Sequence, residues 1–129
     1  MFQGAGMAKR IFVVDDERCI ADTLAAILSK AGYEASAFYN AKTALQEVYF
    51  CAPELVISDV DMPGMNGVDM AVCIREHCRG CKVLLFSGRA TSADLLHAAD
   101  TRGYHFELLS KPIHPRDLLA HIADAASES

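Results

Sequence analysis

The sequence lacks several features that would place it in other protein classes. It has no basic excess, since 12 Lys and Arg stand against 17 Asp and Glu, for a formal net charge of −5. Direct nucleic-acid binding is not expected, because neutralising phosphates requires clustered basic side chains. Membrane insertion is not expected either, because a spanning helix needs about 20 consecutive apolar residues and no run approaches that length.

Signs of secretion and of several domains are also missing. The N-terminus has no basic region followed by an apolar run, so no secretory leader is expected. The five cysteines are an odd number, which favours a reduced, cytoplasmic compartment. No repeat or linker divides the chain, and 129 residues are the size of one domain with its own core.

The ends of the sequence differ from its middle. Residues 1–7, "MFQGAGM", are glycine-rich and resemble the remnant of a cleavable tag or a disordered tail. We therefore expect the folded domain to span residues 8–126 and residues 127–129 to form a short tail.

Short apolar runs alternate with amphipathic segments through the remaining sequence. We predict strands at residues 10–14, 33–38, 55–58, 82–87 and 104–110. We predict helices at residues 17–31, 41–50, 68–77, 92–100 and 115–125. Continuous apolar strands between amphipathic helices are typical of a parallel sheet covered on both faces, so the predicted fold is a doubly wound α/β domain.

Polar residues follow four of these strands directly. The first strand is followed by Asp15 and Asp16, and the third, within "LVISDVDMPGMNG", by Asp59 and Asp61. The fourth ends in Ser87-Gly88, and Lys111-Pro112 follows the fifth. Ligands of open parallel sheets bind at the carboxyl ends of the strands, so these groups are expected to share one crevice.

The chemistry of this set indicates a cation beside an anion. Neighbouring carboxylates raise each other's pKa, and a bound cation removes that penalty. Oxygen ligands favour Mg²⁺, with Mn²⁺ as a substitute, and Mg²⁺ leaves coordination positions for another group. A hydroxyl and an ammonium on the other side would suit a phosphoryl group.

The same residues, each after the appropriate strand, resemble the receiver domain of two-component response regulators. The resemblance covers about residues 8–126, and "DVDMPGMNG" is close to that family's phosphorylation loop. It implies a chemotaxis-regulator-like, flavodoxin-like fold with five parallel strands in the order 2-1-3-4-5. It also implies a signalling switch that is not an enzyme beyond slow self-dephosphorylation.

The resemblance assigns a role to each site residue. Asp59 would accept phosphate from a phosphohistidine, and Mg²⁺ would be bound by Asp16, Asp59 and the backbone carbonyl of Asp61, with Asp15 acting through a water. Lys111 would pair with the phosphoryl oxygens, and its bond to Pro112 would be cis. Ser87 would donate its hydroxyl to the phosphoryl group, and Gly88 would keep the approach open and offer its N–H.

Two positions bear on the output and lifetime of the switch. Leu108 stands where the family usually has an aromatic residue, and Tyr104 and Phe106 are offset from it, so we expect a weaker or different conformational readout. Asp61 and Arg89 hold positions that tune phosphoryl lifetime in the family. They could pair across the mouth of the site or be two solvated surface charges.

The segment "CIREHCRGC" contains a Cys-x-x-Cys spacing, Cys78 and Cys81, near Cys73 and His77. This spacing suits zinc or redox chemistry, but it falls between a helix end and a strand start. We interpret Cys73 as a core residue and Cys78 and Cys81 as incidental thiols. The five histidines are scattered, and none is expected to have an acid partner suited to catalysis.

Two other functions remain open. "DVD" after an apolar strand also resembles the nucleophile loop of haloacid-dehalogenase-type phosphatases, although Met62-Pro63 replaces the threonine expected there. A pseudo-receiver that only binds is the other alternative. For the switch, the resemblance implies a sensor histidine kinase or phosphotransfer protein as partner, an unidentified effector, and dimerisation on phosphorylation as one output.

Overall fold

Strands and helices alternate along the computed structural model, which describes residues 9–88, 92–112 and 114–127. The strands within these ranges are β1 (Arg10–Val14), β2 (Glu34–Phe38), β3 (Leu55–Asp59), β4 (Lys82–Ser87) and β5 (Glu107–Ser110). The helices are α1 (Arg18–Lys30), α2 (Ala41–Phe50), α3 (Gly67–His77), α4 (Ser92–Thr101) and α5 (Pro115–Ser127). None of these helices is both long and apolar enough to cross a membrane.

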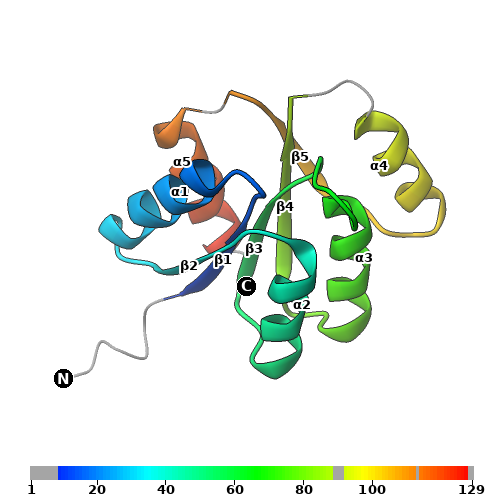
Figure 1. Cartoon of the computed structure of the whole chain (residues 1–129), viewed down its shortest axis with the longest axis horizontal. Coiled ribbons are helices and arrows are strands. Elements are labelled where there is room, and N and C mark those ends of the chain that lie inside the picture. The colour runs from blue at the N-terminus through cyan, green and yellow to red at the C-terminus, as the bar shows by residue number, and fades with distance from the viewer. Residues whose placement is uncertain (1–8, 89–91, 113, 128–129) are drawn as a thin grey trace.

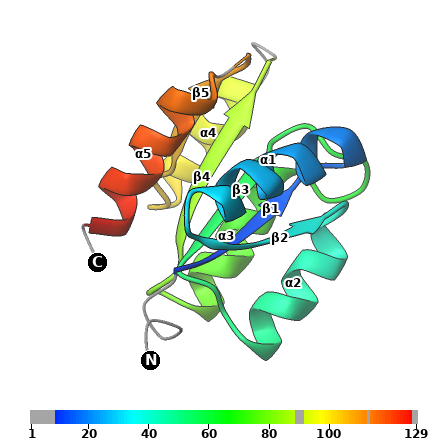
Figure 2. The same ribbon diagram turned by 90° about the vertical axis from the view of Figure 1, so that its left-hand side faces the viewer.

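All strand pairs are parallel, and the order across the sheet is β2-β1-β3-β4-β5. Helices α1 and α5 cover one face of the sheet, and α2, α3 and α4 cover the other (Figures 1 and 2). This is the doubly wound flavodoxin-like (βα)5 fold that the sequence predicted. The expected placement of β2 at the edge is confirmed.

Alternate residues of each central strand supply the two cores. In β1, Ile11 and Val13 pack in the cluster that includes Leu118 and Ile122 of α5. Phe12 and Val14 pack in the cluster formed with α2 and α3. A strand turns successive side chains to opposite faces, so an uninterrupted apolar run is what a sheet buried on both faces requires.

The predicted boundaries lie within two residues of the observed ones, except at the start of β5. Strand β5 begins at Glu107 instead of residue 104, because Tyr104 and Phe106 pack against the α3 side of the core without joining the ladder. Strand β3 runs one residue further than predicted and ends on Asp59. The predicted tag remnant at residues 1–7, Arg89 and the last two residues lie outside the described ranges.

Candidate functional site

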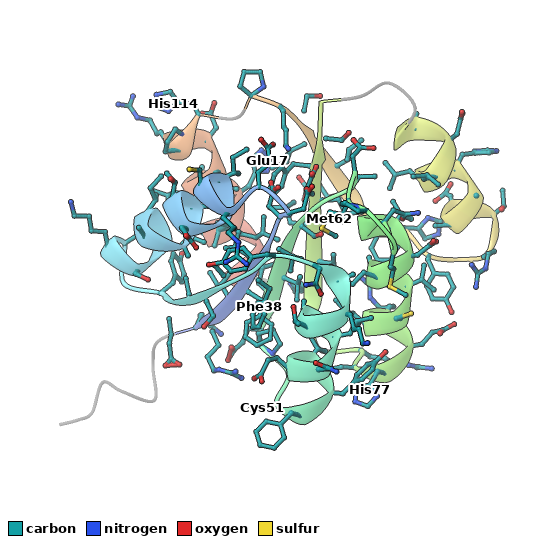
Figure 3. All side chains as sticks on the ribbon, in the orientation of Figure 1. Glu17, Phe38, Cys51, Met62, His77 and His114 are labelled. Atoms are coloured by element: carbon teal, nitrogen blue, oxygen red, sulfur yellow. The ribbon has the colours of Figure 1, made fainter. Side chains whose placement is uncertain are left out.

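Two buried carboxylates lie at the carboxyl ends of the adjacent strands β1 and β3. Asp15 is 0% exposed and Asp59 is 4% exposed. The ladder pairs Val14 with Ser58, so the next residue of each strand, an aspartate in both cases, is brought to the same place. In Figure 3, Glu17 and Met62 mark this end of the sheet, and Cys51 and His77 lie at the opposite end.

The backbone around each acid is fixed by hydrogen bonds. The Asp15 N–H donates to the Phe38 carbonyl at 3.0 Å, and the Glu17 N–H donates to Asp15 Oδ1 at 2.9 Å. Asp15 is therefore not the N-cap of α1; that position belongs to Glu17, whose side chain makes no capping bond. Beyond Asp59, the Val60 N–H donates to the Phe86 carbonyl at 3.0 Å.

Lys111, which follows the edge strand β5, brings a positive charge to these acids. Its Nζ lies 3.2 Å from Asp59 Oδ1 and 3.7 Å from Asp15 Oδ2. The Lys111 N–H donates to the Ser87 carbonyl at 2.9 Å, which ties the loop after β5 to the end of β4. The peptide bond to Pro112 is cis, as the resemblance implied.

The single Lys111 ammonium does not balance the negative charge of the two buried carboxylates. Asp15 Oδ2 and Asp59 Oδ1 are buried and make no hydrogen bond to a described residue, although Lys111 is near both. Burial raises the pKa of Asp15 to about 6, and the neighbouring Asp59 carboxylate adds to this, whereas Lys111 opposes it. Burial also raises the pKa of Asp59, again against Lys111. The site therefore favours binding of additional positive charge.

A third carboxylate completes a group that fits a metal ion. Asp15, Asp16 and Asp59 can each offer a side-chain oxygen, and these atoms lie within 4.8 Å of one another. The donors are all oxygen, the type that Mg²⁺ and Mn²⁺ prefer, and the orphaned buried oxygens of Asp15 and Asp59 need a positive partner. The residues present thus fit the predicted ion.

The remaining predicted residues surround Asp59. Ser87 is 6% exposed at the end of β4, and its hydroxyl donates to Asp61 Oδ2 at 3.0 Å. The Asp61 side chain therefore contacts Ser87 and is not in the three-acid cluster. Gly88 is exposed beside Lys111, and a Cβ there would meet Lys111 Cβ at 3.6 Å, an ordinary van der Waals contact.

Comparison with known proteins decides the family. The response regulator receiver domain family matches residues 11–123, most of the chain. The chain belongs to this family. The family supports a phospho-acceptor signalling switch and binds Mg²⁺ at an acidic pocket such as this one.

Individual relatives agree with this assignment. A CheY-like response regulator receiver domain protein from Methanospirillum hungatei superposes with a TM-score of 0.85 and 27% identity, covering 94% of this chain and 95% of the other. The beryllofluoride-activated NtrC4 receiver domain dimer gives a TM-score of 0.80 and 29% identity over 92% and 97% of the two chains. The DNA-binding response regulator MtrA of Mycolicibacterium paratuberculosis is 28% identical over 90% of this chain but only 50% of its own length. The receiver thus spans about half the length of the curated relatives it matches.

Gly67 has a role in the receiver that the sequence did not reveal. It lies one residue before the predicted helix start at residue 68 but is the first residue of α3, and a Cβ built on it would lie 2.2 Å from the Asp59 carbonyl oxygen. Its N–H donates to the Val60 carbonyl at 2.9 Å. The absent side chain lets α3 approach the backbone of Asp59. Glycine at a helix start, where many residues are better helix formers, was the available signal.

The expectation that Cys73 is the core cysteine and Cys81 an incidental thiol is wrong. Cys81 is the core residue, 1% exposed, and burial raises the pKa of its thiol to about 12. Cys73 and Cys78 are only partly buried and pack against that core. In the described ranges, the acidic residues Asp15, Asp16 and Asp59 are the one group placed to share a metal, and it contains no cysteine.

Two histidines have acid partners, but at the surface and away from the acidic cluster. His121 Nδ1 lies 3.1 Å from Glu107 Oε2, and His105 Nδ1 contacts Asp100 Oδ1. These side chains are 40% to 73% exposed, so both contacts lie at the surface. They belong to α5, β5, α4 and the segment before β5, not to the acidic cluster.

Proposed function

We propose that Asp59 accepts a phosphoryl group from a phosphohistidine of a sensor histidine kinase or phosphotransfer protein. A carboxylate oxygen of Asp59 attacks phosphorus, the bond from phosphorus to the imidazole nitrogen breaks, and that nitrogen keeps the electron pair. The observation that carries the proposal is the position of Lys111 Nζ, 3.2 Å from a buried Asp59 oxygen with no hydrogen bond to the described residues. A transferred oxyanion at Asp59 would meet this ammonium.

The other site residues would hold the metal and the phosphoryl oxygens. Asp15, Asp16, Asp59 and the Asp61 backbone carbonyl would bind Mg²⁺, or Mn²⁺ in its place. When bound, the ion would neutralise negative charge on the carboxylates and the phosphoryl group. Ser87 would exchange its 3.0 Å bond to Asp61 for one to a phosphoryl oxygen, and the Gly88 N–H would donate to another.

Phosphorylation can be tested without identifying the kinase. Incubation with acetyl phosphate and Mg²⁺ should add one acid-stable, base-labile phosphoryl group per chain, measured by intact mass. Asp59→Asn should remove it, whereas the matched variant Asp69→Asn, which changes an exposed acid of α3, should retain it. Equal incorporation in Asp59→Asn would disprove the acceptor assignment, and no incorporation in the unaltered chain would indicate a pseudo-receiver.

We propose that the chain is a switch and not a phosphatase of the haloacid-dehalogenase type. Family membership supports the switch, as receiver domains are generally signalling modules. Slow loss of the phosphoryl group, over many minutes, is expected. Rapid turnover of phosphomonoesters by the purified chain would favour the phosphatase alternative instead.

The conformational readout is proposed to be weaker than an aromatic switch would give. Leu108 packs against the α3 and α4 side of the core, where its strand pairs it with Leu85. The nearby aromatics are held elsewhere: Tyr104 donates its hydroxyl to Glu76 at 2.8 Å, and Arg75 lies over the Phe106 ring at 5.1 Å. Amide spectra with and without beryllofluoride should therefore change little over α4, β5 and α5. A full rearrangement of that face would contradict this.

The proposal extends to the bounds of the folded receiver, its cellular location and its partners. We place the folded receiver at residues 8–126 and locate it in the cytoplasm, where its thiols would stay reduced. MtrA is named as DNA-binding, but residues 8–126 are not proposed to contact nucleic acid, as the whole chain has a formal net charge of −5. NtrC4 dimerises in its beryllofluoride-activated form, so sizing with and without beryllofluoride tests whether activation drives dimerisation here.

A further inference from the structure

An apolar groove lies between α2 and the loop that follows β3. Its volume is about 670 Å³, and its apolar lining includes Leu45 and Tyr49 of α2 and Pro63 and Met65 of the loop. That volume is within the range of small-molecule sites, roughly 300 to 1,000 Å³. The groove is separate from the acidic cluster, since none of Asp15, Asp16 and Asp59 lines it.

The groove contains two of the three large hydrophobic side chains that are exposed among the described residues. The three are Tyr49, Phe50 and Met65, whose exposed fractions are 47%, 86% and 38%. Tyr49 and Met65 line the groove, and Phe50 is the next and last residue of α2. The Tyr49 ring rests on the His77 ring with centroids 4.5 Å apart, so one wall is already held in position. Exposed apolar patches of this kind commonly mark binding sites.

Charge identifies the kind of ligand. Lys42 is the one charged residue in the lining, which contains no acid even though the whole chain carries −5. Lys42 makes no ion pair with a described residue and lies in the first turn of α2, which has no acidic residue. A cation at the positive end of a helix dipole leaves that end favourable for an anion.

We infer that this groove binds a small organic carboxylate with an apolar body. The apolar part packs on Tyr49 and Met65, and the carboxylate meets the Lys42 ammonium and the positive end of α2. Asn40, Thr43 and Gln46 supply polar groups along the rim. The inference does not depend on phosphorylation of Asp59, so it can fail or succeed independently of the proposed function.

The test is an amide NMR titration of the whole chain with 3-phenylpropionate and with its neutral analogue, 3-phenylpropan-1-ol. We expect saturable shifts confined to α2 and residues 63–67, with tighter binding of the carboxylate. Lys42→Gln should weaken binding of the carboxylate about two- to fivefold and leave the alcohol unaffected, because one exposed charge interaction is lost. Met65→Ser should weaken both ligands.

Lys30→Gln is the matched control, since Lys30 is exposed in the last turn of α1 and does not line the groove. It should bind both compounds as the unaltered chain does. Shifts that do not saturate below about 10 mM overturn the inference. Equal weakening by Lys42→Gln and Lys30→Gln also overturns it, because the carboxylate would then be responding only to net charge.

Discussion

At the amino ends of the strands, the Arg10 guanidinium donates to the carbonyls of Cys51 and Ala52, at 3.2 and 3.1 Å, and faces Glu34 at 3.8 Å. At the carboxyl ends, Asp15 and Asp59 each bury an oxygen that has no hydrogen bond to a described residue. The first group of charges is partly solvated and paired, and it joins chain segments. The second is dehydrated and short of positive charge, which costs stability and prepares a binding site.

The largest effect is expected from filling the space beneath Asp59. Gly67→Ala would place a Cβ 2.2 Å from the Asp59 carbonyl oxygen, so α3 or the end of β3 must move. We expect a loss of about 3 kcal/mol or more in the free energy of unfolding, measured by urea denaturation, together with slower phosphorylation. Gly80→Ala, near the amino end of β4, is the matched control.

A Cβ at Gly80 meets nothing within 4 Å. We therefore expect Gly80→Ala to change the unfolding free energy by less than about 1 kcal/mol. Similar losses for the two variants would show that the contact of α3 with Asp59 is not what requires glycine.

Removing a buried charge at the carboxyl ends should stabilise the metal-free chain. Asp15→Asn keeps the side-chain oxygen that accepts from Glu17 but removes the dehydrated charge, so at neutral pH in EDTA the gain should be about 1 to 3 kcal/mol. Asp16→Asn, at an exposed position, should change stability by less than about 0.5 kcal/mol. Urea titrations measure both changes. A loss of stability in Asp15→Asn would contradict the view that the buried Asp15 charge costs stability.

The same charge predicts the pH dependence of stability. The pKa of Asp15 is about 6 in the folded chain against an ordinary 3.8, so between these values the folded state binds more protons than the unfolded state. Metal-free stability should therefore fall as pH rises from about 4 to about 6, by up to about 3 kcal/mol, and then level off. Asp59, whose pKa is also raised, should add to this fall.

Asp15→Asn and saturating Mg²⁺ provide the controls for that pH dependence. Each should reduce the slope of the unfolding free energy against pH. The variant does so because the titrating carboxyl group is gone, and the ion does so because it favours the charged form of the carboxylates. Unfolding free energies between about pH 4.5 and pH 7.5 measure the slope. An identical slope in Asp15→Asn would show that other groups cause it.

The smallest effect is expected at the amino ends. Arg10→Ala removes the bonds to the Cys51 and Ala52 carbonyls, but water can replace them because the Arg10 side chain is 30% exposed. The expected loss is about 1 kcal/mol, opposite in sign to that of Asp15→Asn. Arg10→Lys keeps the charge without the planar fork and should fall between Arg10→Ala and the unaltered chain in thermal denaturation.

Much of the fold could be predicted because its signals are local. Apolar runs such as residues 10–14 and 82–87 specify buried strands by themselves, and Asn40, whose side chain accepts from the Thr43 N–H, marks the start of α2. The start of β5 was placed too early because Tyr104 and Phe106 alternate like strand residues. Their packing against α3 and its core, a contact between distant segments, overrides that pattern.

The sequence by itself determined which acids, hydroxyl and lysine follow which strand, and parallel strands necessarily bring those ends to one edge. Only the tertiary structure decided how the groups there divide their contacts. It directs the Asp61 side chain to Ser87, sets Gly67 beneath the Asp59 carbonyl, and buries Cys81 more deeply than Cys73. Such contacts join residues from different elements, so they depend on how loops and helices pack, which no local pattern specifies.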